Sequence, residues 1–412
     1  MASVWGVLFI IAGLVISVAL HELGHMLFAR LFGVPVPEFA VGFGPKIFSR
    51  RWRGTTYSLR AIPLGGFVRI PGMFPPAPAR TRLTNRRGEP TLAEQARAES
   101  AASLPVGQEN HAFYLLSAPR KILVMLAGPL MNLLICIVLT AIAMCGIGYQ
   151  APTTTVAQVL PTVSTARGEM TGPAAASGLV EGDVIEAING ATINEWSEVQ
   201  QAIAQAPTRT VDLTVKRANQ HIRVTLTPET SESGQGIAGI VAGTAYRSAS
   251  LAQLWQMNTT MAQGTVALII RLPQAVWKVA VSVVTDAPRD SQGLISVVGV
   301  GRIAAEVTGE STALGVRDIR QSLSVLLMLL ASLNMALCIF NVLPLPPLDG
   351  GHIMGALYEG MRRRIVLWRG GADPGPADTA RLMPLTYVVG ASLLVMTVIL
   401  VLADIIKPIS VT

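Results

Sequence analysis

The chain has 412 residues, of which 51% are hydrophobic and only 14% are charged. Soluble proteins carry about 25% charged residues, so this composition excludes an ordinary soluble domain and indicates a membrane protein. The net charge of +7 would suggest nucleic-acid binding in a soluble protein. Basic cytoplasmic loops account for it here, and we expect no nucleic-acid partner.

Four apolar stretches are long enough to cross a lipid bilayer as helices, which takes about 20 residues each. They predict a polytopic α-helical membrane protein with four transmembrane helices. The first stretch lacks the basic N-terminal region of a signal peptide and is too long for one, so we expect it to be retained. The predicted spans cover residues 4–32, 121–149, 322–342 and 385–406.

The stretch between the first two spans begins with an apolar segment, residues 39–70, that is too short to span and too apolar for a free loop. Residues 55–59 and 66–70 read as short strands, with Gly65 and Gly66 in or beside their connection. We expect a membrane-associated β-hairpin near the functional site. An ordinary cytoplasmic hairpin without a role there is the alternative. Residues 71–103 are rich in Pro, Ala and Arg, which predicts flexibility.

Residues 151–244 are more polar and alternate like strands at 211–215 and 221–226, with a short helix expected at 197–205. Residues 174–190 resemble the core of a bacterial PDZ domain, a β-rich module that accepts a peptide by strand addition. The length suits one such domain, and a generic β-rich domain is the alternative.

Residues 245–321 are predicted to form an extracytoplasmic interfacial segment. Residues 266–284 are apolar but include Arg271, Pro273 and Lys278, which favours an interfacial amphipathic helix over a spanning one. Residues 294–301 are too short to cross a bilayer and suggest a packed or re-entrant turn. The expected domains are thus 1–150, 151–244, 245–321 and 322–412.

The distribution of charge predicts the orientation in the membrane. Residues 30–121 carry 14 Lys and Arg against 5 Asp and Glu, whereas residues 149–320 carry 12 against 14. Residues 344–384 carry five against four. The positive-inside rule therefore places the first and third connections in the cytoplasm and the PDZ-like domain outside. Both chain ends then lie outside as well.

A metal-binding motif lies inside the first predicted span. His21-Glu22-Leu-Gly-His25 is an H-E-x-x-H pattern, in which two imidazoles one helical turn apart can bind zinc and the glutamate acts as general base. Ionisable residues at membrane depth are costly and usually functional. The motif therefore predicts one zinc ion, held toward the cytoplasmic half of the membrane, with Glu22 as the catalytic base.

A zinc hydrolase needs about three protein ligands and one open position, and Asp349 is the best third candidate. It follows the prolines that end the third predicted span and precedes Gly350. Non-helical backbone at membrane depth is tolerated only inside protein or beside a water-filled cavity, as a hydrolytic site requires. His352 is held in reserve as a ligand.

Two asparagines at membrane depth are further candidates. Asn341, at the end of the third span, and Asn132, in the second span, are candidate contacts to the substrate or transition state, as are Gly65 and Gly66. A helix-end amide satisfied by backbone is the alternative for Asn341, and a structurally satisfied amide the alternative for Asn132.

The order of these motifs resembles one protease family. His21-Glu-Leu-Gly-His25, Gly128-Pro-Leu-Met-Asn132, the PDZ-like insertion and Asn341-Val-Leu-Pro-Leu-Pro-Pro-Leu-Asp-Gly350 look like the site-2 protease family of intramembrane zinc metalloproteases. The likeness is to the bacterial regulator-of-sigma-E protease branch, although that branch's best-known members have two PDZ domains. It implies zinc ligation by His21, His25 and Asp349, with Glu22 as catalytic residue.

The resemblance also implies partners and location. Substrates of this family are single-pass membrane proteins, often anti-sigma factors, already trimmed by an upstream site-1-type protease. We therefore expect an intramembrane zinc endopeptidase of the bacterial cytoplasmic (inner) membrane that acts in regulated intramembrane proteolysis. The PDZ domain would either exclude substrates with a bulky ectodomain or hold a newly formed C-terminus. The rival hypotheses are a membrane-anchored protease with a soluble active site and a non-catalytic scaffold.

Overall fold

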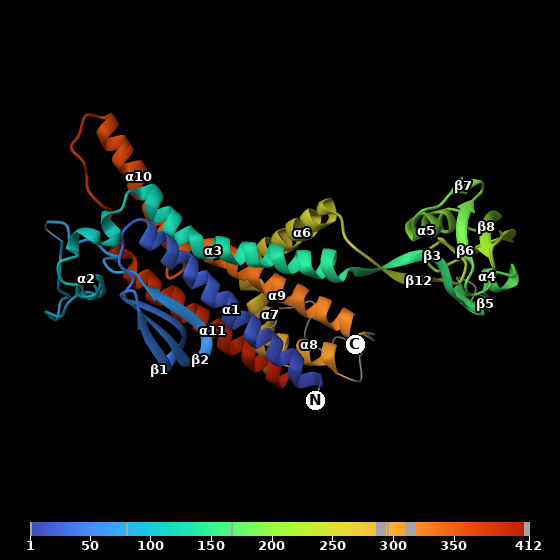
Figure 1. The fold of residues 1–412 in the computed structure, drawn as a ribbon, viewed down its shortest axis with the longest axis horizontal. Coiled ribbons are helices and arrows are strands. Elements are labelled where there is room, and N and C mark those ends of the chain that lie inside the picture. Colours follow the sequence, from blue (N-terminus) through green and yellow to red (C-terminus); the bar gives the residue numbers. More distant parts are fainter. Residues whose placement is uncertain are drawn as a thin grey trace. The chain divides into compact units, whose positions relative to one another are not determined.

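The computed structural model describes residues 2–79, 81–165, 168–285, 294, 296–309 and 318–407. The chain forms two compact units, one from residues 1–145 and 250–412 and the other from residues 146–249. The first unit is mainly helical and the second mainly β-structure (Figure 1). Each unit is described by itself.

Four helical segments of the first unit are long and apolar enough to cross a membrane, or five if one bent pair is counted as a span, within the part of the chain that the structure describes. This confirms the four predicted spans at the level of length and composition. The segments are α1 (Ala2–Leu31), α3 (Ala118–Ala141, extended by a π-helical turn at Ile142–Ile147), α9 (Ile319–Val342) and α11 (Met383–Ile406), which follows the 3-10 turn Thr379–Leu382.

Helices α1, α3 and α9 pack against one another, and they run side by side in Figure 1. A Cβ atom at Gly13 would lie 2.5 Å from the side chain of Leu330, so the missing side chain admits α9 close to α1. Next to it, Asn334 donates a hydrogen bond of 2.9 Å to Ser17. Small residues and polar pairs of this kind hold apolar helices together where lipid offers no hydrophobic driving force.

Strands β1 (Glu38–Trp52) and β2 (Thr55–Arg69) fold over into a small sheet. Residues 38–41 pair with both 56–59 and 66–69 of β2, while residues 46–52 pair with 55–60. The hairpin turn is at Arg53 and Gly54, both with positive φ. The prediction of a turn at Gly65 and Gly66 is therefore wrong, because residues 55–59 and 66–69 belong to one strand and flank residues 38–41.

Several helices lie where the sequence predicted other structure. The single helix predicted at 266–284 is wrong, because α6 (Leu251–Ile270) ends within this range and α7 (Leu272–Val284) begins after Arg271, at a bend of 67°. The turn predicted at 294–301 is wrong where described, because α8 (Val297–Thr308) occupies it. The polar connection after α9 contains α10 (Asp349–Trp368).

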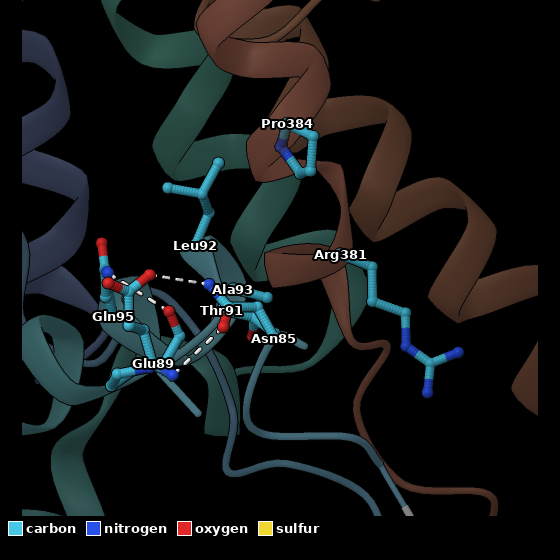
Figure 2. Close-up of a pocket in the computed structure, with 9 residues that line it drawn as sticks. Asn85, Glu89, Thr91, Leu92, Ala93, Gln95, Arg381 and Pro384 are labelled. Carbon is cyan, nitrogen blue, oxygen red and sulfur yellow. Dashed lines mark hydrogen bonds between the residues drawn. The ribbon is translucent and has the colours of Figure 1, made fainter. Parts of the chain in front are cut away.

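The insert at 71–103, predicted to be flexible, contains α2 (Leu92–Ala102) and is followed by 3-10 turns at Glu109–His111 and Phe113–Leu115. Its Arg97 makes two hydrogen bonds of 2.8 Å to Asp378, and both side chains are less than a tenth exposed. Next to this contact, residues 85–95 of the insert line a cavity of about 380 Å³ together with Arg381 and Pro384 (Figure 2). The insert is therefore anchored to the start of the last spanning helix.

The second unit is a small β-rich domain. Its main sheet has the strand order β12-β3-β6-β8-β9, with β7 beside β6. The buried core lies between this sheet and α5, and includes Trp196, Val199 and Leu213. The strands are β3 (Tyr149–Val159), β4 (Thr162–Thr165), β5 (Gly168–Thr171), β6 (Val184–Ile188), β7 (Ala191–Thr192), β8 (Val211–Arg217), β9 (Gln220–Leu226), β10 (Glu229–Thr230), β11 (Gly236–Ile237) and β12 (Ile240–Arg247); the helices are α4 (Pro173–Ala176) and α5 (Trp196–Ala204).

A buried carboxylate makes the stability of this unit sensitive to acid. Asp183 is fully buried, and Arg217 donates two hydrogen bonds of 2.7 Å to it. These bonds hold the pKa of Asp183 below its ordinary value. A group whose folded pKa is depressed stabilises the fold above its unfolded pKa, and this contribution is lost as the pH falls through the folded pKa.

We therefore expect Arg217→Met to lower the stability of residues 146–249 by about 2 kcal/mol at neutral pH. The difference from wild type should shrink as the pH falls below about 4, because Asp183 then becomes protonated in both proteins. Proteolysis and hydrogen exchange within 146–249 measure this. The exposed Arg209 gives the matched control Arg209→Met, and a difference that stays constant with pH would contradict the assignment.

Candidate metal centre

Three potential metal ligands converge between α1 and the start of α10. His21 and His25 lie one turn apart on α1, and Asp349 is the first residue of α10. The two Nε2 atoms are 3.2 Å apart, and Asp349 Oδ2 is 3.3 Å from each of them. Among the described residues these three form the group of side chains able to hold a metal ion.

The cluster fits a zinc ion. Ligand atoms at about 2.0–2.1 Å from one tetrahedral zinc lie about 3.3–3.4 Å from one another, close to the three separations observed. Asp349 Oδ2 is buried and accepts no hydrogen bond from any described group. A buried carboxylate oxygen without a donor is costly, and a cation between the three atoms removes that cost. Two imidazoles and one carboxylate are also a donor set that suits zinc.

Helix α3 orients both histidines from behind. The Nδ1 atom of His25 lies 2.8 Å from the carbonyl oxygen of Val124, so Nδ1–H donates to it and Nε2 faces the metal position. The side-chain amide of Asn132 is buried and lies 3.1 Å from Nδ1 of His21. With its Oδ1, which has no other partner among the described residues, turned to this position, the amide accepts from Nδ1–H and leaves Nε2 of His21 free to face the metal. Partners of this kind fix the tautomer and orientation of a ligating histidine. Asn132 therefore contacts a ligand from behind, which differs from the substrate contact that the sequence suggested.

Two glycines allow α3 to approach this closely. A Cβ atom at Gly24 would lie 2.5 Å from the carbonyl oxygen of Ala127, and one at Gly128 would lie 2.3 Å from His25 Nε2. Side chains at either position would push the helices apart or displace a ligand. The sequence analysis did not predict this role of Gly128. The motif Gly128-Pro-Leu-Met-Asn132, which carries the family resemblance, could have indicated it.

Two more glycines bring Asp349 to the histidines. A Cβ atom at Gly350 would lie 2.0 Å from the carbonyl oxygen of Leu343, and one at Gly351 would lie 2.8 Å from the nitrogen of Pro346. The chain therefore reverses tightly after α9, with the start of α10 packed against the backbone at the end of α9.

A cavity of about 360 Å³ opens beside His21, His25 and Asp349, and Glu22 lines it. The backbone N–H of Val68 lies beside the Glu22 carboxylate. A Cβ atom at Gly66 would lie 3.2 Å from Glu22 Cγ and 2.9 Å from the carbonyl oxygen of Ala40, so a side chain there would crowd the carboxylate. The lining residues are His21, Glu22, His25, Gly66, Phe67, Val68, Arg69, Ile70, Met73, Met125, Pro347, Asp349 and His352.

The remaining predicted site residues are outside the group of potential metal ligands. Gly65 has a positive φ, and a Cβ atom there would be 2.6 Å from the ring of Phe43; it is outside the lining set. Asn341, near the end of α9, is also outside it. His352 lines the cavity one turn beyond Asp349 but is not in the ligand group. The sequence predicted that the hairpin lies near the site, and the structure adds that Phe67 to Ile70 are among its residues that line the cavity.

Comparison with known proteins agrees with this geometry. The model of peptidase family M50 matches residues 9–370. The chain belongs to this family. Rip1, a zinc metalloprotease of Mycobacterium tuberculosis, is 29% identical over 441 residues, with 99% of each chain covered. The Rip1 of Mycolicibacterium smegmatis is 30% identical, with 98% of each chain covered.

A third M50 relative is the regulator of sigma-W protease RasP of Bacillus subtilis. It is 27% identical, over 83% of this chain and 87% of RasP. The predicted site-2 protease resemblance is thus confirmed, and the chain is a zinc metalloprotease. With its apolar helices, this M50 member is a multi-pass membrane protein.

The close approach at Gly128 predicts a specific loss of metal. We expect Gly128→Ala to lose most of its zinc, because the added methyl group would overlap His25 Nε2, while its helix content should stay unchanged. Metal analysis of the purified protein and circular dichroism measure the two properties. Gly264→Ala on α6 is the control, since a Cβ atom there meets nothing within 4 Å. Full zinc occupancy in Gly128→Ala would contradict the packing argument.

Proposed function

We propose that this protein is an intramembrane endopeptidase that cleaves transmembrane segments of single-pass membrane proteins, with one zinc ion held by His21, His25 and Asp349. The observation that carries the proposal is the position of the ligand cluster. Two ligands lie on α1, which is apolar enough to span a membrane, and a cavity of about 360 Å³ opens directly beside them. A soluble active site would not need ligands on such a helix.

Each residue of the site has a separate role in the proposed hydrolysis. A bound zinc ion supplies a Lewis acid that polarises the scissile carbonyl and lowers the pKa of water. The Glu22 carboxylate faces the same cavity and takes the proton of the attacking water, then returns it to the leaving amide nitrogen. Val124 and Asn132 hold the histidine rings.

The edge of the small sheet offers a way to present a peptide. Residues 66–69 pair with 38–41 on one side, and Gly66, Phe67 and Val68 line the cavity. A strand pairing on one side presents free backbone groups to another chain. A transmembrane helix satisfies its own amide hydrogen bonds and must unwind before cleavage. Strand addition along 66–69 would hold the unwound segment beside the zinc ligands.

The proposed membrane orientation rests on the distribution of charge, and the proposed substrates rest on the relatives. The excess of Lys and Arg in residues 30–121 supports an orientation in the bacterial inner membrane with this connection inside. The catalytic site then lies toward the cytoplasmic half and residues 151–244, as one PDZ domain, lie outside. The name of RasP, a regulator of sigma-W protease, supports anti-sigma factors as substrates. A site-1-type protease would trim them first.

Replacing the proposed base tests the chemistry. Glu22→Gln should cleave a reporter transmembrane substrate at least about 100-fold more slowly than wild type, because an amide cannot take the proton, while it keeps its zinc. Asp349→Ala should lose both zinc and activity. Cleavage rates and metal content, measured on the same preparations, separate the two effects. Normal cleavage by zinc-loaded Glu22→Gln would refute this mechanism.

Deleting residues 151–244 distinguishes the two roles proposed for this domain. If the domain filters substrates by size, the deletion variant should cleave a substrate that still carries its ectodomain. If it docks a newly exposed C-terminus, the variant should cleave the trimmed substrate more slowly than wild type. The measurement is the cleavage rate of the trimmed and the untrimmed form of one reporter. The deletion variant that also carries Glu22→Gln gives the background rate. If the deletion changes neither rate, both proposed roles of the domain are excluded.

A further inference from the structure

The β1–β2 sheet carries a large apolar surface that no described part of the chain covers. Every residue of β1 from Phe43 to Trp52 is exposed. Large exposed apolar surfaces of this kind mark sites of contact with a membrane or a partner. The exposed apolar side chains on the two strands are Phe43, Ile47, Phe48, Trp52, Leu59 and Ile62.

The strand register sets the direction of this sheet along α1. Arg30, near the C-terminal end of α1, donates a hydrogen bond of 2.6 Å to Thr55, next to the hairpin turn. At the other end of β2, the Cβ position of Gly66 lies 3.0 Å from Val18. Arg30 and Val18 are about 18 Å apart along a helix. The sheet therefore extends from the C-terminal end of α1 back along the spanning helix.

The basic residues of the sheet fall into two groups. Lys46, Arg60 and Arg69 each form an ion pair with Glu38, at 3.5, 2.8 and 3.2 Å. The second group is at the turn, where Arg50 pairs with Tyr57 and Arg51 with Thr56 in the register. Arg50, Arg51 and Arg53 are exposed and have no acidic partner among the described residues.

The turn also carries an aromatic side chain. Trp52 is 56% exposed, and the guanidinium of Arg53 lies 4.9 Å from its ring centre. Tryptophan with neighbouring arginines is the combination found at membrane–water interfaces, where the ring lies at headgroup level and the cations meet phosphate. Farther from the turn, toward the middle of α1, the sheet instead presents apolar side chains such as Phe43 and Ile62.

We propose that Arg50, Arg51, Arg53 and Trp52 bind the headgroups of anionic phospholipids at the membrane surface beside the C-terminal end of α1. The inference rests on the proposed intramembrane function. It adds that the lipid holds the sheet at a fixed depth, with its apolar part in the acyl region. Because residues 66–69 belong to the same sheet and line the catalytic cavity, anionic lipid would also position the edge that receives the substrate.

The test uses the full-length protein in vesicles of phosphatidylcholine with or without an equal amount of phosphatidylglycerol. Association of spin-labelled phosphatidylglycerol, relative to spin-labelled phosphatidylcholine, is measured on Glu22→Gln protein, so this readout does not depend on cleavage. We expect a preference for phosphatidylglycerol that falls by about fivefold or more in R50Q/R51Q/R53Q. R50K/R51K/R53K should keep the preference.

The matched control is R82Q/R86Q/R87Q, which removes three exposed arginines of the insert at 71–103 and should keep the wild-type preference. A preference that survives in R50Q/R51Q/R53Q, or is lost equally in the control, would overturn the proposal. So would slower cleavage by R50Q/R51Q/R53Q in pure phosphatidylcholine that affects only substrates with acidic flanks, since the arginines would then bind substrate. Failure of the protease function itself would appear separately, as absent cleavage by wild type.

Discussion

The close contact between α1 and α3 is the constraint on which the site depends. Gly24 lets α1 meet the backbone of α3 at Ala127, and Gly128 leaves room for the rings of His25 and His21. Only at that distance can the carbonyl of Val124 and the amide of Asn132 reach these rings. The contact fixes both ring orientations before any metal binds. Preorganised ligands of this kind bind metal without paying to order their side chains.

The second requirement is a polar group and a cavity at membrane depth. The tight reversal after α9, with Gly350 packed on Leu343, starts α10 at the site and places Asp349 within 3.3 Å of both histidines. The sheet closes another side of the cavity, where Gly66 leaves room for Glu22. The reversal reaches the cavity at Pro347, and non-helical backbone at membrane depth is tolerated beside such a cavity.

Sequence patterns predicted the elements with strong local signals and failed where the signal was nonlocal. Apolar length found the four spans, and alternation found the two strands at 211–215 and 221–226, which pair with each other. The small sheet was misjudged because residues 38–41 pair with two separate parts of β2, a topology that period-two alternation cannot show. The insert was judged flexible by composition, yet Arg97 bonds to Asp378, 281 residues away.

The sequence by itself determined the chemistry. The spacing of His21 and His25 places both on one face of a helix. Ionisable side chains in such an apolar helix carry a free-energy cost in a membrane, which already indicated a functional role. Only the tertiary structure decided what supports them. The role of Asn132 behind His21, the need for glycine at 128 and the sheet edge at 66–69 all arise from contacts between helices and strands distant in sequence. Such contacts require interatomic distances that are correct to within a few tenths of an ångström, and no residue pattern encodes that precision.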